Sequence, residues 1–474
     1  MLKPMDKELT VQIHHPDRGW MKCATLHFDD RLELGPIGPV SIRYLDDYAM
    51  DDQHVAKLGT LGWPAAWMQV PLQLNERASF KSWPLFLMDM LPQGAAWDFC
   101  STSIGLKGRS EANYLALTGH PKGVKAAIFL KNMAKAPIGN LRVRENLNGL
   151  SDSEFAFRNL PFTMSKSAVP RLYMAYDGGL LDGIVAGGDA PKVALRLSPD
   201  QAMAWVDFNV DILSPDPWYL VKLSRRHDGS NKPAAERDQA ILRAEYAYYQ
   251  ELDALGFNTL DCSSLFLDES GGEPALWMPR FDRAWNPDRQ HWQLLGVESL
   301  AAAIGQRGFL RHEAVLIELQ TLHSMNPEAF SDPFESLVLE WLRRDLLNVI
   351  FGNTDNHARN TSFIKDRQGI RLAPIYDFAP MAADNSSIHR SIRWQKEIER
   401  GSEIDWGRLP THLQALQLAD ADAVRQTLVD TMQCCLGLYE RLQVRSVSQE
   451  ILHHPRIDMQ RLDQRLKAWL KTLV

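Results

Sequence analysis

The segment FGNTDNHARNTSFI, residues 351–364, decides how the chain is interpreted. An apolar helix is expected to end at Gly352 and a strand to begin near Thr361, which leaves a polar loop between them. Asp355 and Asn360 have the spacing D-x-x-x-x-N in this loop. Phosphoryl transfer needs a carboxylate that accepts the proton of the attacking hydroxyl, and a neutral oxygen ligand that holds Mg²⁺ against the phosphates. The alternative is a polar turn in which Asp355 is only a cap.

A second acidic residue follows this loop. The stretch RLAPIYDFAP, residues 371–380, predicts a short strand that ends in Asp377. Kinases place a metal-binding aspartate at this point, after the catalytic loop. Here Asp377 is followed by Phe-Ala instead of Phe-Gly, and strands often end at an aspartate. Asp377 indicates a metal-binding aspartate mainly because it follows Asp355 and Asn360 in the order found in kinases.

A glycine pair occurs before the apolar stretch VALRL. In DGIVAGGDAPK, residues 182–192, Gly187 and Gly188 would let backbone N–H groups approach phosphate closely. The stretch does not match GxxxxGK[ST], so a P-loop NTPase is unsupported. The alternative is an ordinary hairpin turn.

One lysine interrupts the apolar strand WYLVKLS, residues 218–224. A lysine in such a run usually needs a charge partner, and Glu245 in the predicted helix 234–257 is the candidate for Lys222. A strand lysine paired with a helix glutamate is how kinases hold the α- and β-phosphates. The alternative is a solvent-exposed lysine on an edge strand. The combined order of glycine loop, Lys222, Glu245, D-x-x-x-x-N and second aspartate is that of an ATP-dependent phosphotransferase.

The hydrophobic patterning predicts an α+β chain with three parts. Residues 1–145 are expected to form a β-rich module, residues 146–280 a small strand-rich lobe with one long helix, and residues 281–474 a large helical lobe. The stretch GVESLAAAIG, residues 296–305, is assigned to the helical part. A bilobal, protein-kinase-like fold is the expected architecture.

Composition narrows the class of protein. The 474 residues include 52 Lys and Arg against 59 Asp and Glu, a net charge of −7, which disfavours a grip on nucleic acid by the protein as a whole. Five scattered cysteines fit neither a disulfide framework nor a CxxC metal site. No secretory leader and no stretch of about 20 apolar residues is found, so no membrane partner and a cytoplasmic location are expected. The adjacent histidines at positions 14 and 15 are expected at the surface.

Several motifs together resemble the HipA family of bacterial toxin kinases. RFDR at 280–283 and TDNHARN at 354–360 carry most of the likeness, and APIYD at 373–377 and GGDAPK at 187–192 add to it. The helix AEYAYYQELDALGF also matches. FLMDMLPQG at 86–94 and GHPKGVKAAI at 119–128 match the family's N-terminal module more loosely.

The resemblance implies a serine/threonine protein kinase that uses ATP and Mg²⁺. It assigns Asp355 as the catalytic acid/base, and Asn360 and Asp377 as metal ligands. It places the following residues at the nucleotide: Gly187, Gly188, Lys192, Lys222, Glu245, Trp277, Met278, Pro279, Arg280, Phe281, His357, Ala358, Arg359, Asn360, Tyr376 and Asp377. Toxins of this family phosphorylate aminoacyl-tRNA synthetases, and a helix-turn-helix antitoxin neutralises them and connects them to operator DNA.

One departure and two alternatives stay open. Several family members carry an autophosphorylated serine just before the paired glycines, and Val185 stands there in this chain. A weakly catalytic or non-catalytic relative that acts by binding an antitoxin–DNA complex is the first alternative. A small-molecule phosphotransferase is the second, because D-x-x-x-x-N followed by an aspartate also occurs in kinases of sugars, antibiotics and lipids.

Overall fold

A computed structural model describes residues 8–28, 32–91, 130, 138–147, 164–169, 190–205, 212–225, 232–401 and 403–473. Its contacts group the chain into two compact units. Unit 1 comprises Met1–Leu223, Asp268–Gly305 and Phe363–Ile370, and unit 2 comprises Ser224–Leu267, Gln306–Ser362 and Arg371–Val474. The three-part division at residues 145 and 280 stays a prediction.

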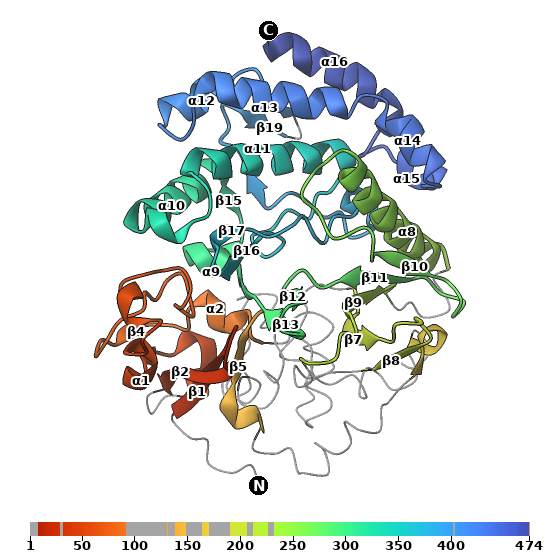
Figure 1. Ribbon diagram of the computed structural model, residues 1–474. Helices are drawn as coiled ribbons and strands as arrows, with labels where there is room; N and C mark the ends of the chain where they lie inside the picture. Colours follow the sequence, from red (N-terminus) through yellow and green to blue (C-terminus); the bar gives the residue numbers. More distant parts are fainter. Residues whose placement is uncertain are drawn as a thin grey trace. The chain divides into compact units, whose positions relative to one another are not determined.

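The first sheet of unit 1 is antiparallel and has the strand order β4-β3-β2-β1-β5 (Figure 1). Apolar residues alternate along the inner strand β1, where Leu9, Val11 and Ile13 are buried. Its strands are β1 Glu8–His15, β2 Gly19–Phe28, β3 Val40–Tyr44, β4 Ala78–Phe80 and β5 Leu141–Val143, accompanied by the short helices α1 Asp46–Ala49 and α2 Leu85–Met88. The predicted β-rich start of the chain is confirmed for these residues.

His14 and His15 are buried, so their predicted surface position is wrong. They lie on β1 between the neighbouring strands β2 and β5, where each side chain faces protein. The imidazole of His14 meets the Trp20 ring edge-on, with 5.2 Å between ring centroids. Burial, assisted by nearby Arg283 and Arg142, lowers the pKa of His14 to about 3, so this side chain is neutral at pH 7.

The second sheet, whose strands other than β10 lie in unit 1, has the order β10-β11-β9-β7-β8-β6. Its central strands were expected from their apolar runs, and the structure confirms them. The strands are β6 Met164–Ser165, β7 Lys192–Leu197, β8 Met203–Trp205, β9 Trp218–Leu223, β10 Phe266–Asp268 and β11 Ala275–Pro279. The predicted strand at residues 171–177 lies outside the described residues.

The stretch 296–305 is a strand followed by a short helix, which corrects the expectation of a helix throughout. β14 (Gly296–Ser299) pairs with β16 (Ser362–Asp366), and α9 (Leu300–Ile304) begins only after Ser299, whose side chain accepts the N–H of Ala302. Buried Glu298 on β14 lies 3.7 Å from the ammonium group of Lys365 on β16. Local periodicity could not show this partner from 67 residues away. The other strands here are β17 Gly369–Leu372 and the hairpin β12 Arg283–Asn286 with β13 His291–Leu294.

The RFDR motif forms a buried charge cluster within unit 1. The carboxylate of Asp282 accepts hydrogen bonds from Arg280 Nε (2.9 Å), Arg280 Nη2 (2.6 Å), Arg283 Nη1 (2.8 Å) and the N–H of Gly139 (2.7 Å). Burial alone raises the pKa of Asp282, but the two guanidinium groups outweigh it and hold the pKa below its ordinary range. The motif therefore fastens residue 139 to the chain that enters β12.

Replacement of Asp282 by asparagine is expected to destabilise unit 1 by roughly 3 kcal/mol, because two buried arginines lose their counter-charge. The pKa of Asp282 is lower in the folded than in the unfolded state. Its charge therefore stabilises the fold fully above about pH 4, and this stabilisation decreases as the pH falls further. The variant should accordingly lose less stability on acidification than the wild type. Urea unfolding between pH 3 and pH 7 measures both effects, with exposed Asp288→Asn as the control; equal midpoints for Asp282→Asn and wild type would contradict the assignment.

Unit 2 is mainly helical. α13 (Ala421–Cys434) packs on α11 (Phe334–Phe351), and α12 (Leu409–Ala415) and α16 (Leu462–Leu473) pack on α13, as Figure 1 shows in blue and teal. The remaining helices are α8 Lys232–Ala254, α10 His312–Met325, α14 Leu438–Val444 and α15 Gln449–Leu452. Its short strands are β15 Leu310–Arg311, β18 Ile392–Arg393, β19 Glu399–Arg400 and β20 Glu403–Ile404. The predicted helical end of the chain is confirmed.

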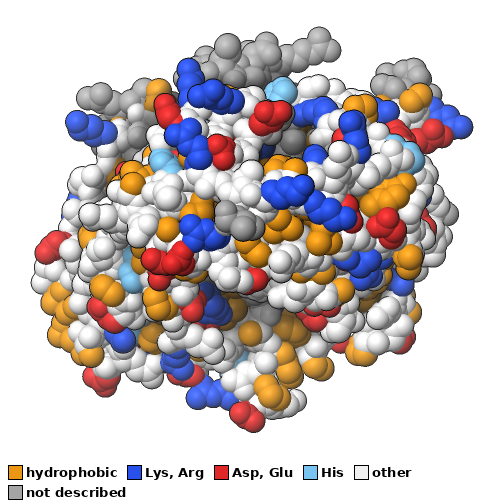
Figure 2. Space-filling view, turned by 90° about the horizontal axis from the view of Figure 1, so that it is seen from above, with side chains coloured by type: hydrophobic (Ala, Val, Ile, Leu, Met, Phe, Trp, Pro, Cys, Tyr) orange, Lys and Arg blue, Asp and Glu red, His pale blue; other side chains and the backbone are white. Residues whose placement is uncertain are grey.

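The surface view fits the charge balance of the sequence. On the face shown in Figure 2, Lys and Arg side chains alternate with Asp and Glu, and neither sign gathers into one continuous area. Among the described residues, no helix is both long and apolar enough to cross a membrane.

Candidate active site

The loop that carries Asp355 begins at a sharp helix end. α11 stops at Phe351, and Gly352 takes the left-handed conformation with φ 70°. A Cβ at this position would come within 2.8 Å of Ile457, so both the conformation and the space require glycine. The N–H of Asn353 then bonds the carbonyl of Asn348 at 2.8 Å. The predicted helix end is confirmed, and β16 begins at Ser362, one residue after the predicted point.

Asp355 and Asn360 are joined through the backbone of the loop. Asn360 Nδ2 donates to the carbonyl of Asp355 at 2.8 Å, and the N–H of Asn360 bonds the carbonyl of His357 at 2.8 Å. Because the amide nitrogen of Asn360 is held by the loop, its Oδ1 is the atom that remains to face a cation. The side chain of Asp355 is 28% exposed and can meet a substrate.

His357 lies beside the carboxylate of Asp355, with 3.6 Å between His357 Nε2 and Asp355 Oδ1. His357 Nδ1 accepts the N–H of Arg359 at 3.3 Å, which leaves Nε2 as the ring nitrogen nearer to Asp355. Ala358 is buried. His357 thus adjoins the carboxylate of Asp355, and its predicted place at the nucleotide stays a prediction.

Asp377 does not end a strand, which corrects the sequence prediction. β17 stops at Leu372, and the chain continues through an isolated parallel bridge between Ile375 and Thr259. Asp377 itself has φ 51°, a left-handed conformation that a non-glycine residue adopts at a cost of roughly 1–3 kcal/mol. Proline at position 374 and the bridge outweigh the apolar run that suggested a continuous strand. Such strain is retained where the surrounding structure fixes the residue, as it does here.

Two tyrosines hold the backbone on either side of Asp377. The hydroxyl of Tyr376 donates to the carbonyl of Arg359 at 2.8 Å and lies 2.6 Å from Ser362 Oγ, which ties Asp377 to the loop of Asp355. The hydroxyl of Tyr249, on α8, accepts the N–H of Phe378 at 3.2 Å. The polar contacts of the Tyr376 hydroxyl are thus with the loop backbone and a neighbouring serine.

Tyr249 is a site residue that the motif search missed. Its hydroxyl also donates to Glu245 Oε1 at 3.1 Å, one helical turn earlier on α8. Burial, together with the charges of Glu245 and Asp377, raises the pKa of Tyr249 well above its usual value, so the hydroxyl stays protonated. The i, i+4 spacing from Glu245 is a signal that could have identified it.

Lys192 and Lys222 lie opposite each other on the adjacent strands β7 and β9. Directly paired residues of antiparallel strands point to the same face of the sheet, where two like charges favour an anion nearby. Lys222 is buried and Lys192 is half-buried. Gly187 and Gly188, which precede Lys192, lie outside the described residues. The pairing of Lys222, in unit 1, with Glu245, in unit 2, stays a prediction.

The residues Trp277–Phe281, which the resemblance places at the nucleotide, run from β11 into the RFDR cluster. Trp277 is fully buried, and the guanidinium group of Arg280 is bonded to Asp282. Pro279 has no N–H, and the N–H of Arg280 donates to the carbonyl of Trp218 at 2.9 Å. The side chains of Trp277 and Arg280 therefore serve the fold of unit 1.

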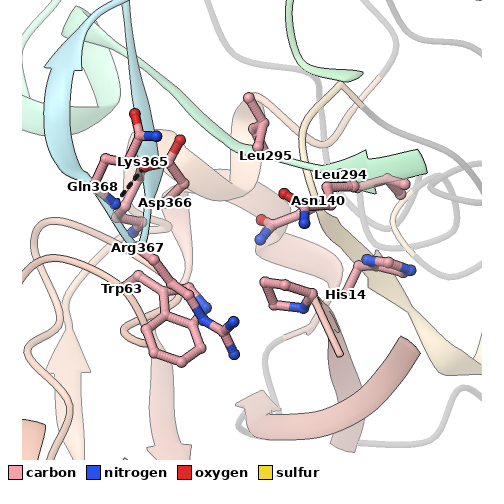
Figure 3. Close-up of a pocket in the computed structure, with 11 residues that line it drawn as sticks. His14, Trp63, Asn140, Leu294, Leu295, Lys365, Asp366, Arg367 and Gln368 are labelled. Carbon is pink, nitrogen blue, oxygen red and sulfur yellow. Dashed lines mark hydrogen bonds between the residues drawn. The ribbon is translucent and has the colours of Figure 1, made fainter. Parts of the chain in front are cut away.

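The structure thus brings the predicted residues together in two groups. Unit 1 holds Lys192, Lys222 and the strand with Trp277, whereas unit 2 holds Glu245, the loop 355–360 and residues 376–377. A small cavity of about 110 Å³ in unit 1 is lined by other residues, among them His14, Trp63, Asn140, Lys365 and Arg367 (Figure 3). It contains none of the predicted site residues. Among the described residues, no group of three His, Cys, Asp or Glu side chains forms a ready metal cage.

A comparison with known protein families identifies the family of this chain. The family model for the HipA-like C-terminal domain matches residues 184–436, more than half of the chain. The chain belongs to the HipA-like family. This match spans the loop with Asp355, Asp377 and both lysines, and it confirms the resemblance inferred from the motifs.

Solved and curated relatives extend the comparison. HipA of Shewanella oneidensis, solved in a complex with HipB and operator DNA, superposes with a TM-score of 0.58 at 15% identity, over 98% of this chain and 96% of that one. This likeness shows the fold, and the α+β, kinase-like HipA fold class predicted from the sequence is confirmed. A Sinorhizobium fredii protein named "Putative kinase Y4mE" is 28% identical over 134 residues, which cover 26% of this chain and 29% of that relative.

Proposed function

We propose that this HipA-like chain is an ATP- and Mg²⁺-dependent kinase that phosphorylates serine or threonine hydroxyls of a protein. The observation that carries the proposal is the braced pair of segments in unit 2. Asn360 holds the backbone of Asp355, and Tyr376 ties the chain before Asp377 to the same loop. A carboxylate, an amide oxygen and a second carboxylate are then held on one connected framework. These are the groups that phosphoryl transfer requires from a protein.

The residues fit Mg²⁺·ATP. Mg²⁺ prefers oxygen ligands and usually keeps waters and substrate phosphates beside one or two protein groups, so Asn360 Oδ1 and Asp377 suffice without a cage of side chains. Bound there, the metal would neutralise phosphate charge. Lys192 and Lys222 share one face of their sheet and would supply positive charge for the phosphates. Asp355 would orient the attacking hydroxyl and accept its proton.

The proposed partners are an antitoxin and a protein substrate, and the comparison with a solved HipA supports the first of them. The Shewanella HipA was solved with HipB and operator DNA, which supports a helix-turn-helix antitoxin for this chain and contact with DNA only through that antitoxin. An aminoacyl-tRNA synthetase is the proposed substrate class, and the cytoplasm the proposed location. Co-purification of the chain with the product of a neighbouring helix-turn-helix reading frame tests the antitoxin.

Transfer of labelled γ-phosphate from ATP tests the reaction. The chain is incubated with Mg²⁺, ATP and a lysate separated into protein and small-molecule fractions. Label in serine or threonine of a protein supports the proposal, whereas label in a small molecule supports the second kind of phosphotransferase. Absence of label from both fractions, with Mg²⁺·ATP bound, would support a non-catalytic relative that acts through its antitoxin.

Tyr249→Phe is expected to weaken Mg²⁺·ATP affinity roughly tenfold, because Phe378 and Glu245 each lose a hydrogen bond that fixes the chain at Asp377, and each such bond is worth about 1 kcal/mol. The neighbouring Tyr248 is a matched control. It is equally buried, and within the described residues its hydroxyl has no hydrogen-bond partner. Calorimetric titration should find Tyr248→Phe within about twofold of wild type. Equal affinities for the two variants would contradict a role of Tyr249 in positioning Asp377.

A further inference from the structure

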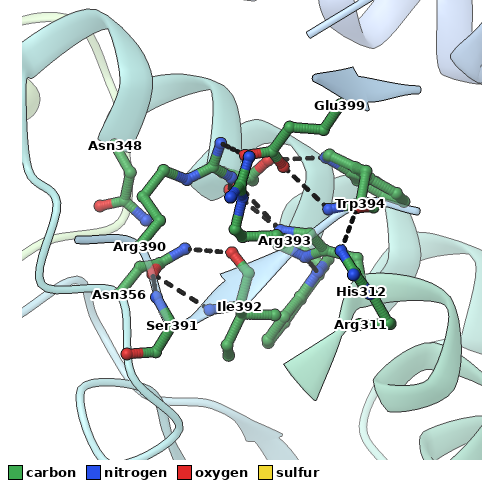
Figure 4. A network of polar contacts seen from close by, with 12 residues as sticks. Arg311, His312, Asn348, Asn356, Arg390, Ser391, Ile392, Arg393, Trp394 and Glu399 are labelled. Atoms are coloured by element: carbon green, nitrogen blue, oxygen red, sulfur yellow. Dashed lines mark hydrogen bonds and ion pairs between the residues drawn. The ribbon is translucent and has the colours of Figure 1, made fainter. Parts of the chain in front are cut away.

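Asn356, directly after Asp355, connects the loop to a segment that follows Asp377. Its Nδ2 donates to the carbonyl of Ile392 at 2.8 Å, and its Oδ1 accepts the N–H groups of Ser391 at 2.8 Å and Ile392 at 3.3 Å (Figure 4). The side chain is buried. A side-chain amide that donates to and accepts from the same stretch of backbone acts like a paired strand, so the position of Asn356 depends on that of residues 391–392.

The same backbone is held from its other side. β18, which contains Ile392, pairs in parallel with β15, and the N–H of Leu310 donates to the carbonyl of Ser391 at 2.9 Å. The carbonyl and N–H groups of Ser391 are thus engaged by two different parts of unit 2. The segment cannot shift at residue 391 without breaking bonds on both sides.

A buried network of charges surrounds this backbone. Arg390 pairs with Asp345 on α11 and with Glu399, and Glu399 also accepts from Arg393 Nε at 2.7 Å. Trp394 completes the network: its Nε1 donates to Asp345 at 2.9 Å and its N–H donates to Glu399 at 2.9 Å. The two carboxylate side chains are 2% or less exposed. Arg390 and Arg393 thus offset the two buried carboxylates, and His312 Nε2 lies 3.3 Å from Asp345 Oδ1.

Kinases commonly order the equivalent segment by a phosphate that pairs with arginine. In this chain Arg390 and Arg393 are already paired with the carboxylates of Asp345 and Glu399. The hydroxyl of Ser386, four residues before Arg390, donates to Asp384, whose carboxylate would repel a phosphate there. Arg390 and Arg393 therefore have carboxylate partners without modification.

We propose that residues 390–399 are a permanently ordered activation segment, and that Asn356 is a positioning residue through which the Arg390–Asp345–Glu399 network aligns Asp355. The inference rests on the proposed kinase function and concerns its regulation. Alignment of Asp355 needs no phosphate on this segment. Within the described residues the side-chain hydrogen bonds of Asn356 go to Ser391 and Ile392, so its proposed effect on the reaction is exerted through Asp355.

The test compares Asn356→Ala and Asn356→Asp with Asn385→Ala. Asn356→Asp keeps an oxygen for the two N–H groups but loses the donor to Ile392. Asn385 is exposed, lies in the same part of the chain, and accepts a side-chain hydrogen bond from Arg237 on α8. Single-turnover phosphotransfer, Mg²⁺·ATP affinity and amide hydrogen exchange are measured for each. We expect Asn356→Ala to lower turnover roughly 10–100-fold with ATP affinity within about twofold of wild type, Asn356→Asp to lie between, and Asn385→Ala to match wild type.

Hydrogen exchange separates this inference from the proposed function. Faster exchange of both 354–361 and 386–399 in Asn356→Ala supports the coupling, and faster exchange of only one of them overturns it. Unchanged turnover, or a parallel loss of ATP affinity and turnover, also overturns the positioning role. If wild type transfers no phosphate, the kinase proposal fails, while exchange still decides whether the segments are coupled.

Phosphatase treatment tests whether turnover depends on phosphorylation of this part of the chain. Wild type treated until intact mass shows no phosphate should keep its full turnover. A loss of turnover on treatment, with phosphate located by peptide mass spectrometry at Ser386, Ser387 or Ser391, would overturn the proposal that the charge network replaces modification.

Discussion

Asp355→Asn is expected to abolish phosphoryl transfer while Mg²⁺·ATP still binds. The substitution keeps the size of the side chain but removes the group that accepts the proton of the attacking hydroxyl. A positioned base contributes about 10²–10⁴-fold to turnover, and its loss affects the transition state more than the bound ground state. The loop should keep its shape, because Asn360 bonds the backbone carbonyl of Asp355 and the N–H of Asp355 bonds Asn353 Oδ1.

Single-turnover transfer of γ-phosphate, together with calorimetry of Mg²⁺·ATP binding, measures the two parts of this prediction. Asp332→Asn, at an exposed position between α10 and α11, is the control for loss of one carboxylate and should match wild type. Turnover of Asp355→Asn within a few-fold of wild type would move the catalytic base to another residue. Loss of ATP affinity in the same variant would instead show that Asp355 binds the metal.

The local course of the chain around Asp355 could be predicted from the sequence. Local signals are enough to predict α11, Gly352 and β16. They are a run of leucine and valine, a glycine that suits a left-handed helix cap, and a polar loop before an apolar strand. The long helix α8 with Glu245 follows from its length and periodicity for the same reason. Local signals place the residue types that chemistry needs.

The contacts that hold those residues could not be predicted in this way. Asn356 bonds Ile392, which lies 36 residues away, and Tyr249 bonds Phe378 across 129 residues. Burial of His14 depends on strands that come from both sides of β1, and the strand at residues 296–299 depends on Lys365 of β16. In each case a distant partner outweighs a local preference, and a single sequence does not name that partner.

Asp377→Ala is expected to remove most of the Mg²⁺-dependent part of ATP affinity. Wild type should bind ATP much more tightly with Mg²⁺ than with EDTA, and the variant about equally weakly in both, because the carboxylate is the one anionic ligand proposed for the metal. The backbone around it is held independently, by Tyr376 on the loop and by Tyr249 on Phe378. The left-handed φ of 51° argues for a second variant, Asp377→Asn, since asparagine tolerates that conformation better than alanine.

Calorimetry with Mg²⁺·ATP and with ATP in EDTA separates the ligand role from strain. If both variants lose the metal-dependent affinity, the metal assignment stands, and if only Asp377→Ala loses it, the backbone conformation is the cause. Asp366→Asn, at the end of β16, serves as the carboxylate control. Metal-dependent affinity equal to wild type in both variants would exclude Asp377 as the ligand. Paired with Asp355→Asn, which should bind Mg²⁺·ATP without turnover, this variant should fail at the binding step, because the two aspartates would act at successive stages of one reaction.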